Sequence, residues 1–184
     1  MKASHWKKLE SSEVLSHPRI HLIEDTVELP DGKKTKYIRH APYKNHAVII
    51  IAINNKGEIL VQKEYSYPPD VIMWQLPGGS IEDTEDVLQA ANRELSEESG
   101  YVADSSKEIG YFYVNNRRSD EKQYIVLSTD LREKVGQRDE EEFIETHWMP
   151  VAKLREMVAL GQCNNINLLA ALNIWFCRSD TTEA

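Results

Sequence analysis

The sequence has little cysteine and no long apolar run. Its 184 residues include two cysteines, Cys163 and Cys177, whose spacing fits neither a disulfide framework nor a cysteine-ligated metal centre. The most apolar stretch, Ala47 to Ile53, is too short to cross a bilayer and predicts a buried strand. The first residues lack the apolar stretch of a secretory signal, so we expect a cytoplasmic protein.

An excess of positive charge is also absent. The chain has 22 Lys and Arg against 30 Asp and Glu, which gives a net charge of -8, and no basic stripe. We therefore expect neither nucleic acid nor an anionic membrane as a partner, and a small polyanionic substrate would need a metal ion to offset the repulsion. The chain has no internal repeat, and its length fits one domain with room for a small appended element.

Alternation and helical periodicity predict a mixed sheet flanked by helices, an α/β or α+β sandwich rather than an alternating Rossmann pattern. We expect an N-terminal hairpin over Glu13 to Arg39, and a second hairpin that joins strands at Ala47–Asn54 and Ile59–Glu64. The remaining expected strands are Met73–Leu76, Ile109–Val114, Gln123–Thr129 and Phe143–Met149, and the expected helices are Glu85–Ser99, Val151–Leu160 and Ile166–Phe176. Residues 1–42 would form a β-hairpin extension, and residues 43–184 the main domain.

Three carboxylates are the most informative feature of the chain. Glu94, Glu97 and Glu98 stand at i, i+3 and i+4, so a helix with about 100° per residue places them on one face. Glu98 falls within the apolar stripe, between Val87 and Ala91, so its carboxylate is partly desolvated and needs a partner. A solvated helix rich in glutamate is the alternative for the carboxylates taken alone.

The residues around this helix support a metal site. A turn at Pro77 to Gly79 precedes it, with Thr84 or Asp83 as the expected cap and Gly100 as its stop. Hard oxygen ligands suit Mg²⁺ or Mn²⁺, which also bind phosphate oxygens, and the Gly78 carbonyl can join them. Arg93 can pair with Glu97 at i+4 and fix its rotamer. This set favours metal-assisted attack of water on a phosphoanhydride.

The spacing of the stretch from Gly79 to Tyr101 resembles the signature of the Nudix hydrolases. Gly79, Glu85, Arg93-Glu94-Leu95, Glu97-Glu98 and Gly100 match every fixed position, and Tyr101 stands where the family usually has an aliphatic residue. The resemblance implies an α/β/α sandwich, a divalent metal, and hydrolysis of a nucleoside diphosphate linked to another group. It also implies that Glu94, Glu97 and Glu98 bind the metal with the Gly78 carbonyl, while Arg93 and Glu85 orient them.

Outside this signature the chain resembles the ADP-ribose and nucleoside diphosphate sugar pyrophosphatases. The similar segments are Asp31-Gly32, Val61 to Pro68, Trp74-x-Leu76-Pro77-x-Gly79, Ser119-Asp120-Glu121 and Glu142-Phe143-Ile144-Glu145. In that subfamily a glutamate on this late loop often serves as the general base. The resemblance thus implies Glu142 as the base, with Glu141 and Glu140 as alternatives, and a solvated acidic turn is an equal reading.

The chain departs from the subfamily at three places. Lys63-Glu64-Tyr65-Ser66 replaces the usual Arg-Gln-Tyr-Arg, Gln75 replaces a glutamate, and Asn115 to Arg118 replace a segment that carries a proline in ADP-ribose enzymes. Arg117 and Arg118 can clamp a phosphate or a sugar hydroxyl, and Tyr65 can stack on a base. A solvated loop is the alternative for the two arginines.

The expected function is Mg²⁺- or Mn²⁺-dependent hydrolysis of a nucleoside diphosphate sugar such as ADP-ribose, giving a nucleoside monophosphate and a sugar phosphate. The alternatives are a nucleoside triphosphate or dinucleoside polyphosphate hydrolase and a non-catalytic nucleotide-sugar sensor. In the resembling subfamily the N-terminal hairpin often exchanges between subunits, so Val14 to Arg39 implies a homodimer. A hairpin packed on its own domain is the alternative.

Overall fold

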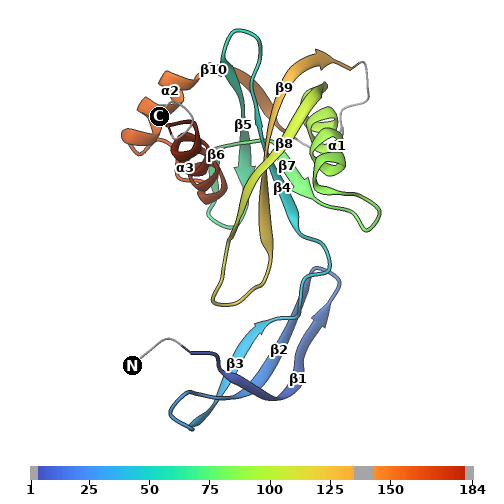
Figure 1. The fold of residues 1–184 in the computed structure, drawn as a ribbon, viewed down its shortest axis with the longest axis vertical. Coiled ribbons are helices and arrows are strands. Elements are labelled where there is room, and N and C mark those ends of the chain that lie inside the picture. Colours follow the sequence, from blue (N-terminus) through green and yellow to red (C-terminus); the bar gives the residue numbers. More distant parts are fainter. Residues whose placement is uncertain (1–3, 135–142, 181–184) are drawn as a thin grey trace. The chain divides into compact units, whose positions relative to one another are not determined.

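The computed structural model describes residues 4–134 and 143–180 of the chain (Figure 1). Contacts between residues divide the chain into two compact units. The N-terminal unit contains Met1–Lys44 and the loop Asn115–Glu121, and the main unit contains Asn45–Val114 and Lys122–Ala184. The loop therefore belongs with the N-terminal strands, although it lies far from them in the sequence.

The N-terminal unit is a three-stranded antiparallel sheet in the order β1-β2-β3. The sequence predicted one hairpin here, but Pro18-Arg19 forms an additional turn, since proline suits a turn and cannot donate to a strand ladder. The predicted turn near Gly32 is present, with a positive φ of 84° at that glycine. The strands are β1 (Lys7–His17), β2 (Ile20–Glu28) and β3 (Lys34–His40).

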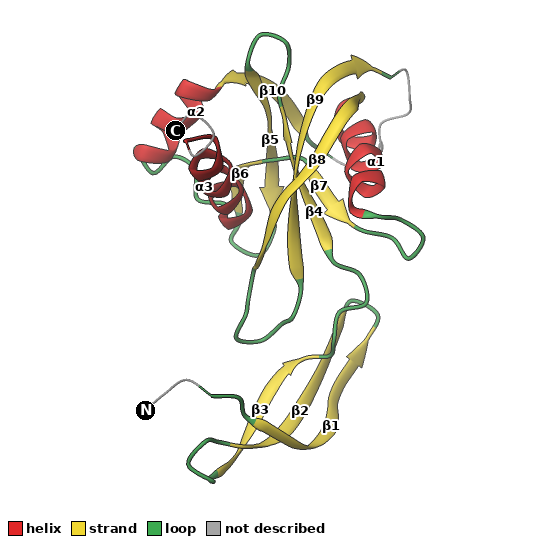
Figure 2. Cartoon of the chain, viewed as in Figure 1, coloured by secondary structure: helices red, strands yellow, loops and turns green. Residues whose placement is uncertain are grey.

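The main unit contains two sheets, drawn as yellow arrows in Figure 2. One is a mixed four-stranded sheet in the order β7-β4-β9-β8, in which β4 runs parallel to β9. The other is an antiparallel three-stranded sheet in the order β10-β5-β6. The strands are β4 (Ala47–Ala52), β5 (Glu58–Ser66), β6 (Val71–Gln75), β7 (Gly78–Ser80), β8 (Tyr101–Tyr113), β9 (Lys122–Glu133) and β10 (Glu145–Pro150).

In the described part of the main unit, three helices cover the sheets: α1 (Val87–Ser99), α2 (Val151–Ala159) and α3 (Ile166–Asp180). Helix α1 packs through Ala91 and Leu95 in one core cluster, while α2 and α3 pack through Leu154 and Leu168 in a second cluster (Figure 1). The helices thus lie on opposite sides of the strands, which confirms the predicted sandwich. None of the described helices has the length and apolar character needed to cross a membrane.

Two local expectations were wrong. Strands β4 and β5 follow each other through a turn, but they share only the bridge between Ile53 and Ile59 and then enter different sheets. Val48 to Ala52 and Ile59 to Val61 are buried apolar stretches, so each strand takes a place inside its own sheet rather than pairing as a hairpin. Gly78 also belongs to strand β7 rather than to a turn, and a Cβ there would lie 2.1 Å from the Val48 carbonyl oxygen.

Candidate active site

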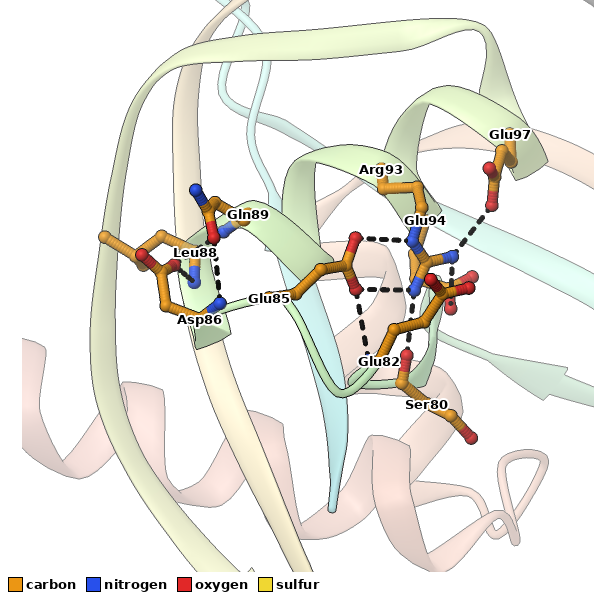
Figure 3. A network of polar contacts seen from close by, with 9 residues as sticks. All are labelled: Ser80, Glu82, Glu85, Asp86, Leu88, Gln89, Arg93, Glu94 and Glu97. Atoms are coloured by element: carbon orange, nitrogen blue, oxygen red, sulfur yellow. Dashed lines mark hydrogen bonds and ion pairs between the residues drawn. The ribbon is translucent and has the colours of Figure 1, made fainter. Parts of the chain in front are cut away.

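Helix α1 begins two residues later than the sequence predicted. Asp86 is its N-cap and accepts hydrogen bonds from the amides of Leu88 and Gln89, each at 2.9 Å. The Gln89 side chain accepts the Asp86 amide at 2.9 Å, which completes a capping box and explains why Thr84 and Asp83 are not the cap (Figure 3). Glu85 therefore lies before the helix, where its side chain can fold back along it.

Arg93 is the centre of the polar network around α1 (Figure 3). Its guanidinium contacts Glu85 through two bonds, Nε to Oε1 at 2.8 Å and Nη2 to Oε2 at 3.1 Å. Nη1 contacts Glu94 at 3.0 Å and Glu97 at 2.9 Å, so the expected i, i+4 ion pair is present. Nη2 also donates to the Ser80 carbonyl at 2.8 Å, which ties the helix to strand β7.

Within this network, Arg93 and Glu85 each stabilise the charged form of the other. The hydrogen bonds from Arg93 hold the pKa of Glu85 below its usual value, and the carboxylates, Glu85 first, raise the pKa of Arg93. Glu85 is 15% exposed and Arg93 is 25% exposed, so the pair is shielded from solvent. Arg93 is thus held in one position against the helix, and it orients Glu94 and Glu97 in turn.

Gly79 makes room for Glu94. A Cβ at position 79 would lie 2.2 Å from Glu94 Oε1, so any side chain there would displace the carboxylate. The signature glycine therefore acts through the missing side chain, which brings the Glu94 carboxylate against the backbone of β7.

Glu98 occupies the edge of the core, as its angular position predicted, and it has the partners that such a carboxylate needs. Its Oε2 accepts the side-chain amide of Gln62 at 3.0 Å and the backbone amide of Gly78 at 3.1 Å. Sequence reasoning missed Gln62. The sequence signal that could have identified it is the position of this glutamine directly after the buried apolar residues Ile59 to Val61.

The carboxylates on α1 fit a divalent metal by their chemistry and by the space that Gly79 leaves. Across residues 4–134 and 143–180, no three acidic, histidine or cysteine side chains already converge as a metal-binding group. The described carboxylates are instead held by Arg93, Gln62 and the Gly78 amide, and Glu97 is 46% exposed. Hard oxygen donors arranged along one helix face can bind Mg²⁺ or Mn²⁺ after small rotamer changes.

Gly100 ends α1 as predicted, with a left-handed φ of 77° and its amide bonded to the Ser96 carbonyl. Glu141 and Glu142, the predicted bases, and their alternative Glu140 lie outside the described residues. Tyr65 is half exposed and donates to Asp70 at 2.8 Å.

Arg117 and Arg118 lie in the N-terminal unit rather than in the unit that carries the signature. Arg118 donates to the Ile38 carbonyl at 2.7 Å and stacks over the Tyr37 ring, 4.9 Å from its centroid. Tyr37 in turn donates to the Arg117 carbonyl. The structure thus gives Arg118 contacts inside its own unit, and a role of either arginine in substrate binding stays a prediction.

Two departures from the subfamily pattern contact each other. Gln75 on β6 donates its side-chain amide to the Glu64 carboxylate on β5. The resembling subfamily usually has glutamine at the position of Glu64 and glutamate at the position of Gln75. This chain has the two residue types exchanged, so one carboxylate and one amide still contact each other across β5 and β6.

Known proteins are similar to this chain in sequence and in fold. The NUDIX domain family matches residues 43–169. The ADP-ribose pyrophosphatase of Bacillus subtilis (strain 168) is 32% identical over 147 residues, which span 79% of this chain and 78% of the relative. The ADP compounds hydrolase NudE of Escherichia coli (strain K12) is 26% identical over 89% of each chain.

A solved structure, described as a crystal structure of ADP compounds hydrolase, has the same fold. Its TM-score is 0.89 over 99% of this chain and 98% of that chain, at 22% sequence identity. The family match spans the strands and the helix that hold Glu94, Glu97 and Glu98, and the Bacillus relative matches over most of its own length. The chain therefore belongs to the Nudix family, and it is a Nudix hydrolase.

Proposed function

We propose that the protein hydrolyses the pyrophosphate bond of a nucleoside diphosphate sugar, with ADP-ribose as the leading substrate. The products would be AMP and ribose 5-phosphate. The observation that carries the proposal is the set of glutamates ordered around Arg93 and against β7, because such a set can bind metal beside a phosphate chain. The names of the Bacillus and Escherichia relatives support a substrate that contains ADP.

In this proposal Glu94, Glu97 and Glu98 hold Mg²⁺, or Mn²⁺ in its place, together with the Gly78 carbonyl. Metal bound there would offset the charge of the pyrophosphate and supply an activated water. Arg93 and Glu85 keep Glu94 and Glu97 in position, and Gly79 keeps the space beside Glu94 open. Glu142, with Glu141 as the alternative, would accept the proton of the attacking water; the support for this base is the resemblance of its loop.

We also propose that the protein is a cytoplasmic homodimer, joined through an N-terminal extension over residues 1–42. Register places Leu15, Ile20 and Ile38 on one face of the three-stranded sheet, and each is at least 40% exposed. A second copy of the chain would cover these side chains. Ile38→Asp should then give a monomer in sedimentation, with Ser16→Asp as the control, because Ser16 on β1 is exposed and its register with His21 places it on the other face. A dimer that persists in Ile38→Asp would contradict this interface.

A substrate panel tests the activity. The protein with Mg²⁺ should release AMP and ribose 5-phosphate from ADP-ribose, and EDTA should stop the reaction. Turnover of a nucleoside triphosphate with release of pyrophosphate, and none of ADP-ribose, would contradict the proposed substrate but leave the metal site intact. Tight binding of ADP-ribose without turnover would indicate a sensor instead.

A further inference from the structure

Gln62 is a fully buried amide in an otherwise apolar stretch of β5. Ile59, Leu60 and Val61 precede it, and all four residues are at most 1% exposed. A buried amide is unfavourable unless it is hydrogen-bonded, and an aliphatic side chain would pack here without that cost. Packing alone therefore does not account for a glutamine at this position.

The side chain of Gln62 meets the carboxylate of Glu98. Its Nε2 donates to Glu98 Oε2 at 3.0 Å, and the same oxygen accepts the Gly78 amide at 3.1 Å. Gln62 lies on β5 and Gly78 on β7, which are strands of different sheets. The two donors thus approach one carboxylate oxygen from both sheets and restrict the rotamers open to Glu98.

The orientation of the Gln62 amide follows from this contact. Its Oε1 is buried and accepts no hydrogen bond from the described residues. Turning the amide over would bring this oxygen against Glu98 Oε2, where two acceptors repel each other. The amide thus keeps its donor on Glu98 and leaves its own oxygen unsatisfied, which indicates a role for the contact beyond stability.

We propose that Gln62 is a positioning residue that holds Glu98 in the orientation needed for metal binding. The inference rests on the proposed metal site and adds to it a residue outside the signature. Groups that orient a metal ligand from behind are commonly worth about 10- to 100-fold in metal affinity. Gln62 has the burial, the donor and the geometry for this task.

Mn²⁺ binding, followed by the electron paramagnetic resonance signal of the free ion, tests the proposal without relying on turnover. Gln62→Met keeps the length of the side chain and removes the donor, so the Kd for Mn²⁺ should rise about 10- to 100-fold. The thermal midpoint in EDTA should change little, and raising Mg²⁺ should recover most of the lost turnover. Gln123→Met is the matched control, because Gln123 is 7% exposed on β9 and its register with Phe112 places it on the face away from α1.

The outcomes separate this inference from the proposed function. An unchanged Mn²⁺ Kd in Gln62→Met, with or without a loss of thermal stability, would overturn the role of Gln62 and leave the metal site in place. Absence of Mn²⁺ binding in the unaltered protein would overturn both. If Gln62→Met does not fold, Gln62→Asn, whose amide is too short to reach Glu98, must weaken Mn²⁺ binding by a similar factor.

Discussion

The two units of the molecule use arginine–carboxylate pairs in different settings. In the main unit, Arg93 lies on α1, whose apolar residues belong to one of two core clusters, and neither cluster includes Arg93 or its glutamates. In the N-terminal unit, Asp25 and Val27 are the only buried residues among those described. Asp25 accepts hydrogen bonds from Ser11 at 2.5 Å and from Arg39 at 2.6 Å. The described part of this unit thus has an ion pair where the main unit has clusters of apolar side chains.

The pKa values follow from these surroundings. Burial opposes ionisation of Asp25, but the hydrogen bonds from Ser11 and Arg39 outweigh it and lower its pKa. Hydrogen bonds from Arg93 lower the pKa of Glu85 against a smaller effect of burial. Under the proposed function, charges around Arg93 in the main unit would serve metal binding, whereas the pair of Asp25 and Arg39 serves the stability of a thin sheet.

The largest expected effect comes from Glu98→Gln. Loss of one metal-binding carboxylate should remove several kcal/mol of transition-state stabilisation, or about a thousandfold in kcat/KM with ADP-ribose and Mg²⁺. The thermal midpoint should hardly change, because the core clusters remain intact. Glu108→Gln, an exposed carboxylate on β8, is the control and should keep full activity. Equal turnover in both variants would end the metal-site interpretation.

Arg93→Lys should have the next largest effect. Lysine keeps the charge but cannot contact Glu85, Glu94 and Glu97 at once, so both kcat/KM and Mn²⁺ affinity should fall about 10- to 100-fold. The control is Arg132→Lys, since Arg132 is 62% exposed and its ion-pair partner among the described residues is the exposed Asp104. A loss of stability without any change in metal affinity would place Arg93 with the structural pairs instead.

Asp25→Asn should affect the N-terminal unit and leave the main unit unchanged. Without the carboxylate charge, Arg39 and Ser11 lose a strong acceptor, which should destabilise the N-terminal sheet by about 1–3 kcal/mol. Amide hydrogen exchange should quicken in β2 and β3, while the Kd for Mn²⁺ stays the same. The exposed Glu10→Gln serves as the control. Weakened Mn²⁺ binding in Asp25→Asn would show that the two units are not separate in function.

The smallest effect concerns the pH dependence of stability. Because the folded pKa of Glu85 lies below its usual value of 4.5, its pair with Arg93 stabilises the fold above about pH 4.5. This contribution is lost as the pH falls through the folded pKa. The unfolding free energies of the unaltered protein and Glu85→Gln should therefore differ at pH 6 and approach each other below pH 4. Urea titrations at each pH measure this, and a gap that widens in acid would contradict it.

The sequence was enough to predict the sandwich, the carboxylate face of α1 and the position of Glu98 at the edge of the core. These follow from helical periodicity and apolar alternation, which are local. The start of α1 was misplaced because the capping box of Asp86 and Gln89 competed with several other acidic caps nearby. The geometry of the hydrogen bonds decides which of these neighbouring residues is the N-cap, and the residue types alone do not.

Partners across strands could not be predicted. Gln62 and Glu98 are 36 residues apart, and Gln75 and Glu64 are 11 apart, so each pair depends on the register of strands and on the docking of α1. Gln75 and Glu64 therefore looked like two unrelated departures from the subfamily pattern. The side-chain hydrogen bond shows that they are one pair, which joins diagonal positions, since the register places Gln75 opposite Gln62 and Glu64 opposite Met73.

The central claim is that the glutamates of α1 form the metal site of this hydrolase, and an anomalous difference map from crystals soaked in Mn²⁺ tests it most directly. The account predicts a peak within bonding distance of carboxylate oxygens of Glu94, Glu97 and Glu98, at about 2.0–2.4 Å. The same map from Glu98→Gln crystals should show a weaker peak or none. Mn²⁺ bound only at other residues, or an undiminished peak in Glu98→Gln, would contradict the account.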